Sequence, residues 1–208
     1  MSVKFNPFLR KRTLFMKRTI FLDFVQGILI GFGLALLTLP IFTSIYITKV
    51  NGWMTMNGCG EPGTGILLRG ACAVTFSGPI NVPQEAKYWT TKIDNTGQKL
   101  TGAHEYIMHF LAGGLPPNYA FWSLTMGNTK NQFVANPLNR FSVGDRSNLV
   151  QNSDGSVDIY IQSTSPAGHE SNWLPAPTGN FILWLRVYLP GQTILNGEYQ
   201  VPPVVEVK

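Results

Sequence analysis

The stretch NFILWLRVYL, residues 180–189, is apolar at both alternating sets of positions, apart from Asn180 and Arg186. Successive side chains of a strand point to opposite faces of a sheet, so such a stretch is typical of a central strand covered on both sides. An arginine in a covered strand needs a charged partner, because an isolated buried charge is very costly. We expect Arg186 to pair with Asp145 or Asp158.

Shorter stretches with a strand-like composition precede it, and turn-forming residues separate them. They are ILLRGACAVTF (66–76), EYIMHFL (105–111), YAFWSLTM (119–126) and VDIYIQ (157–162). In the last stretch, apolar and polar residues alternate with the period of a half-exposed strand. Residues 82–93 fit either a helical stripe or a strand, and we expect a short helix or turn that runs into a strand. The pattern predicts an all-β fold, an antiparallel β-sandwich or jelly roll.

The N-terminal part of the chain has a different composition. Residues 24–48 contain no charged side chain, and a helix of these 25 residues is about 37 Å long, enough to cross a membrane with some tilt. A cleaved signal peptide and a buried core helix are the alternatives. The apolar run is longer than a usual signal-peptide core, and the bulky residues near its end make a poor cleavage site. We expect one uncleaved transmembrane helix.

The charges around this helix predict its orientation. Residues 1–18 hold no acid and six basic residues, which are Lys4, Arg10, Lys11, Arg12, Lys17 and Arg18. On the other side, Lys49 is the only basic residue before Arg69. Because basic flanks stay in the cytoplasm, the N-terminus is expected there. The following domain is then extracytoplasmic, on the periplasmic side of the plasma (inner) membrane.

These observations divide the chain into four parts. Residues 1–19 form a basic cytoplasmic tail, 20–48 a transmembrane helix, 49–84 a linker with the first strand region, and 85–208 the β domain. Of the 16 basic and 11 acidic residues in the chain, ten of each lie in residues 49–208. A nucleic-acid-binding domain would carry excess positive charge on its own surface, so we expect no nucleic acid as a partner.

The tail and the helix instead suggest membrane partners. The basic tail suits anionic membrane lipid. Gly27 and Gly31 are spaced for close packing against a second helix, so a homo-oligomer is one option, and a contact with another envelope protein is a second.

Two cysteines, Cys59 and Cys72, flank a Gly- and Pro-rich stretch. An extracytoplasmic compartment permits a disulfide between them, which would stabilise this region by about 3 kcal/mol on a loop-entropy estimate. Two free, partly buried thiols are the alternative. Two cysteines without nearby histidines are too few for a zinc site.

The motifs of common catalytic sites are absent from the sequence. His104 and His109 are five residues apart, whereas the HExxH zinc motif requires a spacing of four on one helix face. Neither a nucleophile elbow nor a phosphate-binding or dinucleotide-binding glycine loop occurs. His169 lies in a Pro- and Gly-flanked loop, where a solvated histidine is commoner than a catalytic one. We therefore expect no metal site and no cofactor, and we name no catalytic residue.

Residues 133–147 place polar and charged groups beside apolar ones, and Trp173 and Arg186 follow later in the chain. One interpretation is an ion-pair and turn network that joins two sheets. The other is a pocket for an anionic or sugar-like ligand, with arginines for charge and tryptophans as walls. The candidate ligand-binding residues are Arg140, Asp145, Trp173, Arg186 and Trp122.

Several ordered motifs resemble the DUF1214 family over roughly residues 85–203. They are AFWSLTM (120–126), NPLNRFSVGDRS (136–147), DGSVDIYIQ (154–162), NWLPAP (172–177) and LRVYLP (185–190). The resemblance implies a jelly-roll-like β-sandwich without an established activity, and it supplies no catalytic residue. Members of this family often also contain a DUF1254 domain. In this chain an expected membrane anchor stands in its place.

Two functional hypotheses follow. In the first, the chain displays a β-sandwich outside the cytoplasm as a binding or envelope-structural module. In the second, it is an anchored enzyme that acts on a polar or glycan-type substrate near Arg140, Asp145 and Trp173. The lack of a nucleophile–base pair or metal motif favours the first.

Overall fold

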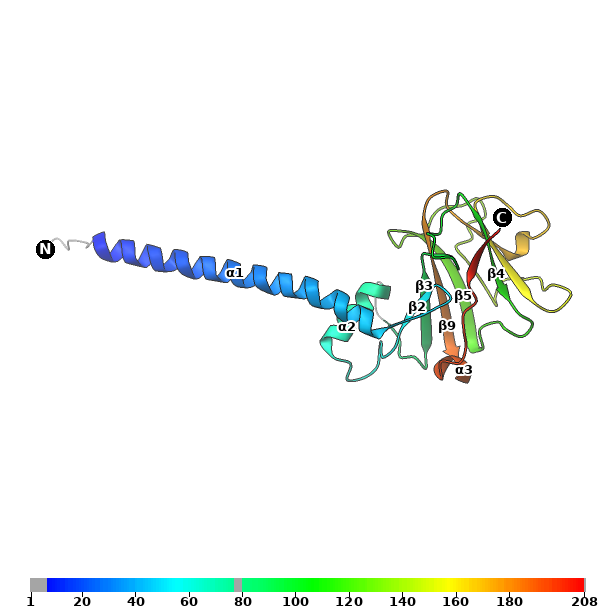
Figure 1. The fold of residues 1–208 in the computed structure, drawn as a ribbon, viewed down its shortest axis with the longest axis horizontal. Coiled ribbons are helices and arrows are strands. Elements are labelled where there is room, and N and C mark those ends of the chain that lie inside the picture. Colours follow the sequence, from blue (N-terminus) through cyan, green and yellow to red (C-terminus); the bar gives the residue numbers. More distant parts are fainter. Residues whose placement is uncertain (1–6, 77–79, 208) are drawn as a thin grey trace.

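The computed structural model describes residues 7–76 and 80–207. Figure 1 shows a long helix that leads into a β-sandwich. The elements in chain order are α1 (Pro7–Tyr46), β1 (Ile47–Val50), β2 (Trp53–Met56), α2 (Ile66–Phe76), β3 (Ala86–Thr91), β4 (Glu105–Phe110), β5 (Asn118–Asn128), β6 (Ser142–Gly144), β7 (Val157–Gln162), the 3-10 helix η1 (Glu170–Asn172), β8 (Trp173–Pro175), β9 (Phe181–Pro190), α3 (Gln192–Leu195) and β10 (Val204–Val207).

Two sheets enclose the main core. One has six strands in the order β1-β2-β3-β9-β5-β6, and the other has four in the order β10-β4-β7-β8. All strand pairs are antiparallel except β7 with β8. The apolar side chains that face each other across the sheets, such as Leu124, Leu185 and Ile159, are completely buried. The β-sandwich expected from the sequence is confirmed.

Strand β9 is central, as its sequence predicts, and it pairs with β3 on one side and β5 on the other. Its inward residues Leu183, Leu185 and Val187 are fully buried. Its outward residues Trp184 and Arg186 are only half-buried. The prediction that both faces are covered is therefore wrong, because the outer face of the six-stranded sheet is only partly covered.

Strands β1 and β2 form a tight hairpin around Asn51 and Gly52, which have φ values of 53° and 82°. A two-residue hairpin turn with both central residues at positive φ is the turn that Asn-Gly favours. The hairpin extends the six-stranded sheet beyond β3, and Trp53 of β2 is buried in the main core.

Residues 66–76 form the helix α2, so the strand expected there is wrong. Leu68, Cys72 and Phe76 are spaced by four residues, which places them on one side of a helix. They pack with Met56 and Cys59 in a small cluster that is separate from the main core. A disulfide joins Cys59 to Cys72, with their Cα atoms 5.8 Å apart.

The ambiguous segment 82–93 forms a turn followed by a strand, in agreement with the expectation. The backbone N–H groups of Glu85 and Ala86 both donate to the carbonyl of Val82, and β3 begins at Ala86. After β3, Asp94 organises the next turn, because its carboxylate accepts backbone hydrogen bonds from Thr96 and Gln98 at 2.8 and 2.9 Å.

Helix α1 contains one segment that can cross a membrane. Within Thr19–Tyr46, an 18-residue stretch has a mean hydropathy of 2.2, and the rest of the protein buries none of it. The helix passes directly into β1. This helix is therefore long and apolar enough to cross a lipid bilayer.

Candidate functional site

Arg140 and Trp173 lie together where β8 begins. The Arg140 guanidinium donates hydrogen bonds to the backbone carbonyls of Glu170 and Trp173, at 2.6 and 2.9 Å. The buried Trp173 ring donates from Nε1 to the carbonyl of Gln162, at 2.9 Å. The Arg140 bonds tie the segment before β6 to η1 and β8, and the Trp173 bond ties β8 to β7. The contacts of both side chains are thus with the backbone of the sandwich.

The other three candidates lie elsewhere. Trp122 belongs to the main core, is 2% exposed, and its ring centroid lies 5.6 Å from that of Phe110. Asp145 is exposed in the turn after β6. Arg186 lies on the outer face of the six-stranded sheet, between Tyr88 of β3 and Ser123 of β5. The structure thus distributes the five residues over four places, and ligand binding by any of them stays a prediction.

The ion pair expected for Arg186 is wrong. Asp158 pairs with His109 on the other sheet. Among the described residues, neither Asp145 nor Asp158 forms a salt bridge with Arg186. The physical reason is that Arg186 is half-buried, so its charge keeps contact with solvent and needs no carboxylate.

A different set of functional groups gathers on the outer face of the four-stranded sheet. We call it the distal face, because β4 lies farther from α1 and α2 than the strands of the other sheet do (Figure 1). Strands β4 and β7 pair here with His109 opposite Asp158 and Ile107 opposite Tyr160. The distal face consists of Glu105, Ile107, His109, Asp158, Tyr160 and Gln162.

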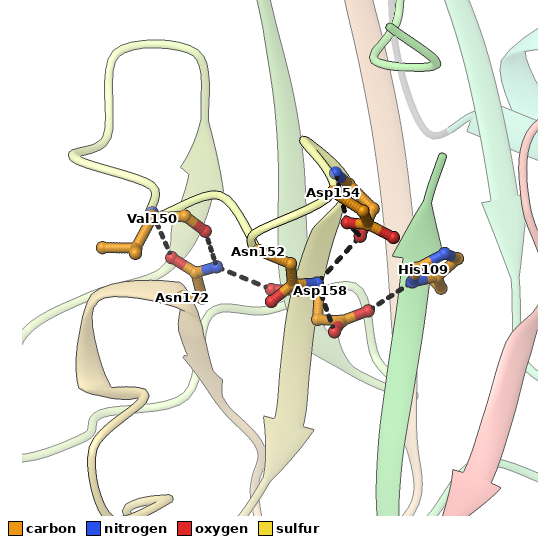
Figure 2. Close-up of polar contacts among 7 residues, drawn as sticks. His109, Val150, Asn152, Asp154, Asp158 and Asn172 are labelled. Carbon is orange, nitrogen blue, oxygen red and sulfur yellow. Dashed lines mark hydrogen bonds and ion pairs between the residues drawn. The ribbon is translucent and has the colours of Figure 1, made fainter. Parts of the chain in front are cut away.

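A hydrogen-bonded network crosses one end of the distal face (Figure 2). The Nδ1 atom of His109 lies 2.6 Å from an Asp158 carboxylate oxygen. The second carboxylate oxygen accepts a bond of 2.9 Å from the Asn152 amide. The Ser156 hydroxyl donates to Asp154 at 2.6 Å. Neighbouring side chains therefore hold the Asp154 and Asp158 carboxylates in place.

Asn172 bonds to the backbone beside this network. Its buried amide nitrogen donates hydrogen bonds to the carbonyls of Val150 and Asp158, each at 2.8 Å. Its amide oxygen accepts a hydrogen bond from the Val150 N–H, also at 2.8 Å. One side chain thus ties the 150 loop, β7 and η1 together. A buried amide with its donors and acceptor bonded is well satisfied, so this part of the network is a structural support.

An aromatic pair lies beside the network. The ring of Tyr160 stacks on His169, with centroids 4.5 Å apart. Tyr160 is half-buried and His169 is exposed. The loop histidine that the sequence leaves as solvated therefore packs on the distal face.

Two carboxyl groups near the distal face have pKa values that hydrogen bonds lower. Hydrogen bonds from the side chain and backbone of Ser156 lower the pKa of Asp154. Backbone hydrogen bonds lower the pKa of Glu170, including one from Gly168. Burial, followed by the charge of Asp158, raises the pKa of the Tyr160 hydroxyl, so this hydroxyl stays a neutral hydrogen-bond donor.

The distal face offers two kinds of chemistry. Fixed carboxylates and amides can hydrogen-bond to a polar ligand, and the exposed edge of an aromatic pair can contact its apolar side. A histidine beside a carboxylate can also act as a general base. No group of three or more metal-ligating side chains occurs within residues 7–76 and 80–207, and no nucleophile is bonded to His109 in that part of the chain.

A pocket lies between the β1–β2 hairpin, β3 and the segment after α3. Its volume is about 250 Å³, and Trp53, Trp89 and Tyr199 contribute aromatic walls. Lys87 donates from Nζ to Asn57 at 2.9 Å, and burial lowers its pKa, against the opposing effect of Glu61. Burial also raises the pKa of Tyr199.

Comparison with known proteins assigns the sandwich to a family. The family model described as "Protein of unknown function (DUF1214)" matches residues 85–192. The chain belongs to this family, as its sequence motifs suggest. The matched range contains all of β4 and β7 and therefore the whole distal face. No curated protein matches the chain.

Two solved structures are similar to the chain. The crystal structure of the VPA0106 protein from Vibrio parahaemolyticus has 32% identity and a TM-score of 0.59, over 70% of this chain and 36% of that protein. A putative uncharacterized protein from Burkholderia cenocepacia has 16% identity and a TM-score of 0.36, over 61% of this chain and 30% of the other. The chain thus spans about a third of the length of these proteins. The Vibrio structure supports the β fold.

Proposed function

We propose that this DUF1214 protein is a single-pass membrane protein that holds its β-sandwich outside the cytoplasm as a binding or envelope-structural module. The observation that carries the proposal is the exposed apolar helix Thr19–Tyr46, which joins the sandwich without a linker. The basic residues before this helix favour a cytoplasmic N-terminus in the plasma membrane.

The two cysteines support the extracytoplasmic placement. Disulfides persist in oxidising compartments and are rare in the cytosol. The structure pairs Cys59 with Cys72, and no free cysteine remains among the described residues. With this orientation the sandwich, its disulfide and its distal face all lie on the periplasmic side.

The topology can be tested with protease on intact spheroplasts. We expect the protease to remove the C-terminal domain and to leave a short membrane-protected fragment that contains the N-terminus. Antibodies against tags at the two ends distinguish the fragments, and a cytoplasmic protein that stays intact is the control for lysis. A C-terminal tag that survives until the membrane is broken would reverse the proposed orientation.

The distal face is the best candidate for the binding surface. It faces away from α1, so a bound envelope component would not collide with the anchor. Its fixed polar groups and the Tyr160–His169 pair fit a polar ligand with an apolar side, such as an envelope glycan. An envelope protein or a second copy of the chain is the alternative partner of such a module.

The second candidate function is an anchored enzyme that acts on a polar or glycan-type substrate. The close contact of 2.6 Å between His109 and Asp158 favours it, because a carboxylate can orient a histidine as a general base. The lack of a bonded nucleophile or metal-ligating group in the described part of the chain makes binding without turnover the better supported function.

Fluorescent peptidoglycan fragments can separate the two candidates on the full chain in detergent. We expect binding without chemical change, and a loss of at least about tenfold, or about 1.4 kcal/mol, in Tyr160→Ala and Asp158→Asn. His104→Ala is the matched control, because His104 also pairs with a carboxylate, Glu206, at 2.7 Å. Fragments that are converted to product by the wild type but not by His109→Ala would instead support the enzyme.

A further inference from the structure

Helix α2 has apolar residues around its whole circumference, and Arg69 is its only charged residue. At 100° per residue, Leu68, Ala71, Cys72 and Phe76 share one side, and this side packs on the sandwich. The opposite side is formed by Ile66, Leu67, Gly70, Ala73 and Val74. A helix that is apolar all round is normally buried on all sides, in protein or in lipid.

The opposite side of α2 is nevertheless exposed in the isolated chain. Ile66 is 83% exposed and Val74 is 70% exposed. Leu67, on the same side of the helix, is 42% exposed. We call these three residues the α2 stripe. An apolar stripe of this kind on a helix held in place by a disulfide requires an apolar partner.

The position of α2 identifies that partner. Ile47, the residue that follows α1, packs in the same cluster as Leu68 and Phe76 of α2. In Figure 1, α2 lies beside the C-terminal end of α1. The α2 stripe is therefore located where the chain leaves the apolar helix.

The length of α1 indicates the level of α2 relative to the bilayer. The 28 residues from Thr19 to Tyr46 span about 42 Å, whereas the hydrocarbon core of a bilayer is about 30 Å thick. When the hydrocarbon core of the bilayer begins after the charged Asp23, it contains about 20 residues of α1. The last turn of α1 then lies in the headgroup region. Helix α2, beside that turn, lies at the same level.

The sheet surface next to α2 has the composition of a membrane interface. The ring of Phe76 contacts Tyr88 of β3, with centroids 6.0 Å apart, which places α2 on the outer face of the six-stranded sheet. Half-buried Trp184, Arg186 and Tyr188 follow on the same face. Trp and Tyr are enriched at the level of lipid headgroups, and Arg can pair with lipid phosphate.

We propose that α2 is an interfacial helix whose stripe enters the outer leaflet of the bilayer that α1 spans. The proposal rests on the proposed membrane anchoring. The contact of α2 with the bilayer attaches the sandwich to the membrane at a second point, besides α1. The outer face of the six-stranded sheet is then directed toward the headgroups. The distal face then points away from the membrane.

Photo-crosslinking of the full chain in phosphatidylethanolamine and phosphatidylglycerol vesicles tests this docking. The photoreactive residue p-benzoylphenylalanine replaces Val74 on the α2 stripe in one variant. In the matched control it replaces Val205, a 40% exposed valine of β10. Val205 pairs with Ile107 and therefore lies on the side of the distal face. A third variant carries the label at Leu29 of α1, which is 63% exposed.

After illumination, mass spectrometry should find a phospholipid adduct at positions 74 and 29 and none at position 205. An adduct at position 29 but not at 74 would overturn the docking of α2 while leaving the anchor intact. A crosslink from position 74 to a second copy of the chain would overturn it as well, in favour of a protein contact. Absence of the adduct at position 29 would show that the proposed anchoring itself fails.

Discussion

Replacing Trp122 by alanine should lower the free energy of unfolding of the sandwich by about 3–5 kcal/mol. The indole is 2% exposed and contacts Phe110 of the opposite sheet. Its removal would leave a large cavity between the sheets, which the close-packed core cannot fill without strain. Chemical denaturation of the full chain in detergent, followed by the near-ultraviolet circular dichroism of the domain, measures the change.

Trp184→Ala is the matched control for this substitution. Trp184 lies on the neighbouring central strand but points to the outer face, where it is half-buried and packs over Gly127. We expect a smaller loss of about 1–2 kcal/mol, because less apolar surface is transferred to water. If Trp122→Ala were as stable as the wild type, the ring would not belong to the core. That result would support Trp122 as a wall of a ligand pocket.

The sequence predicts the sandwich well because the β segments have clear local signals. In β7, apolar residues alternate with polar ones, and the structure places Ile159 and Ile161 in the core. The apolar run of β9 predicts a central strand, which the pairing with β3 and β5 confirms. Alternation and turn residues are local properties, so a single sequence contains them.

The errors arise where a local pattern has two meanings. The 11 apolar-rich residues of α2 are short enough for a strand, and their four-residue spacing is the only helical signal. Arg186 lies in a strand that is apolar on both faces, so the sequence does not tell which face is covered. Which face of β9 is covered depends on the positions of α2 and of the other strands, and tertiary contacts set these positions.

The sequence does not reveal the distal face, for a related reason. Glu105, Ile107 and His109 alternate along one strand, and this alternation is visible in the sequence. The neighbour of His109 is Asp158, 49 residues later, and only the register of β4 against β7 brings them together. The sequence favours Arg140 and Trp173 as candidates, because polar and aromatic residues lie close together along the chain there. The structure uses their polar atoms to bond backbone groups.

Loss of the disulfide should release α2 while leaving the sandwich folded. The bridge closes a loop with a sequence separation of 13, for which chain entropy predicts a stabilisation of about 3 kcal/mol. Cys59, Cys72 and Met56 belong to a small cluster that shares no buried residue with the main core. We therefore expect the effect to be concentrated in residues 57–76.

The double variant Cys59→Ser, Cys72→Ser tests this in the membrane-reconstituted full chain. Hydrogen exchange of peptides from α2 should become faster, whereas peptides from β9 should keep their protection and serve as the internal control. In the wild type, both thiols should resist alkylation after denaturation until a reductant is added. Free alkylation without reductant would show that the pair is not bridged. Equal loss of protection in α2 and β9 would show that α2 is part of the sandwich's cooperative unit, because a separately docked helix can open without exposing the strands.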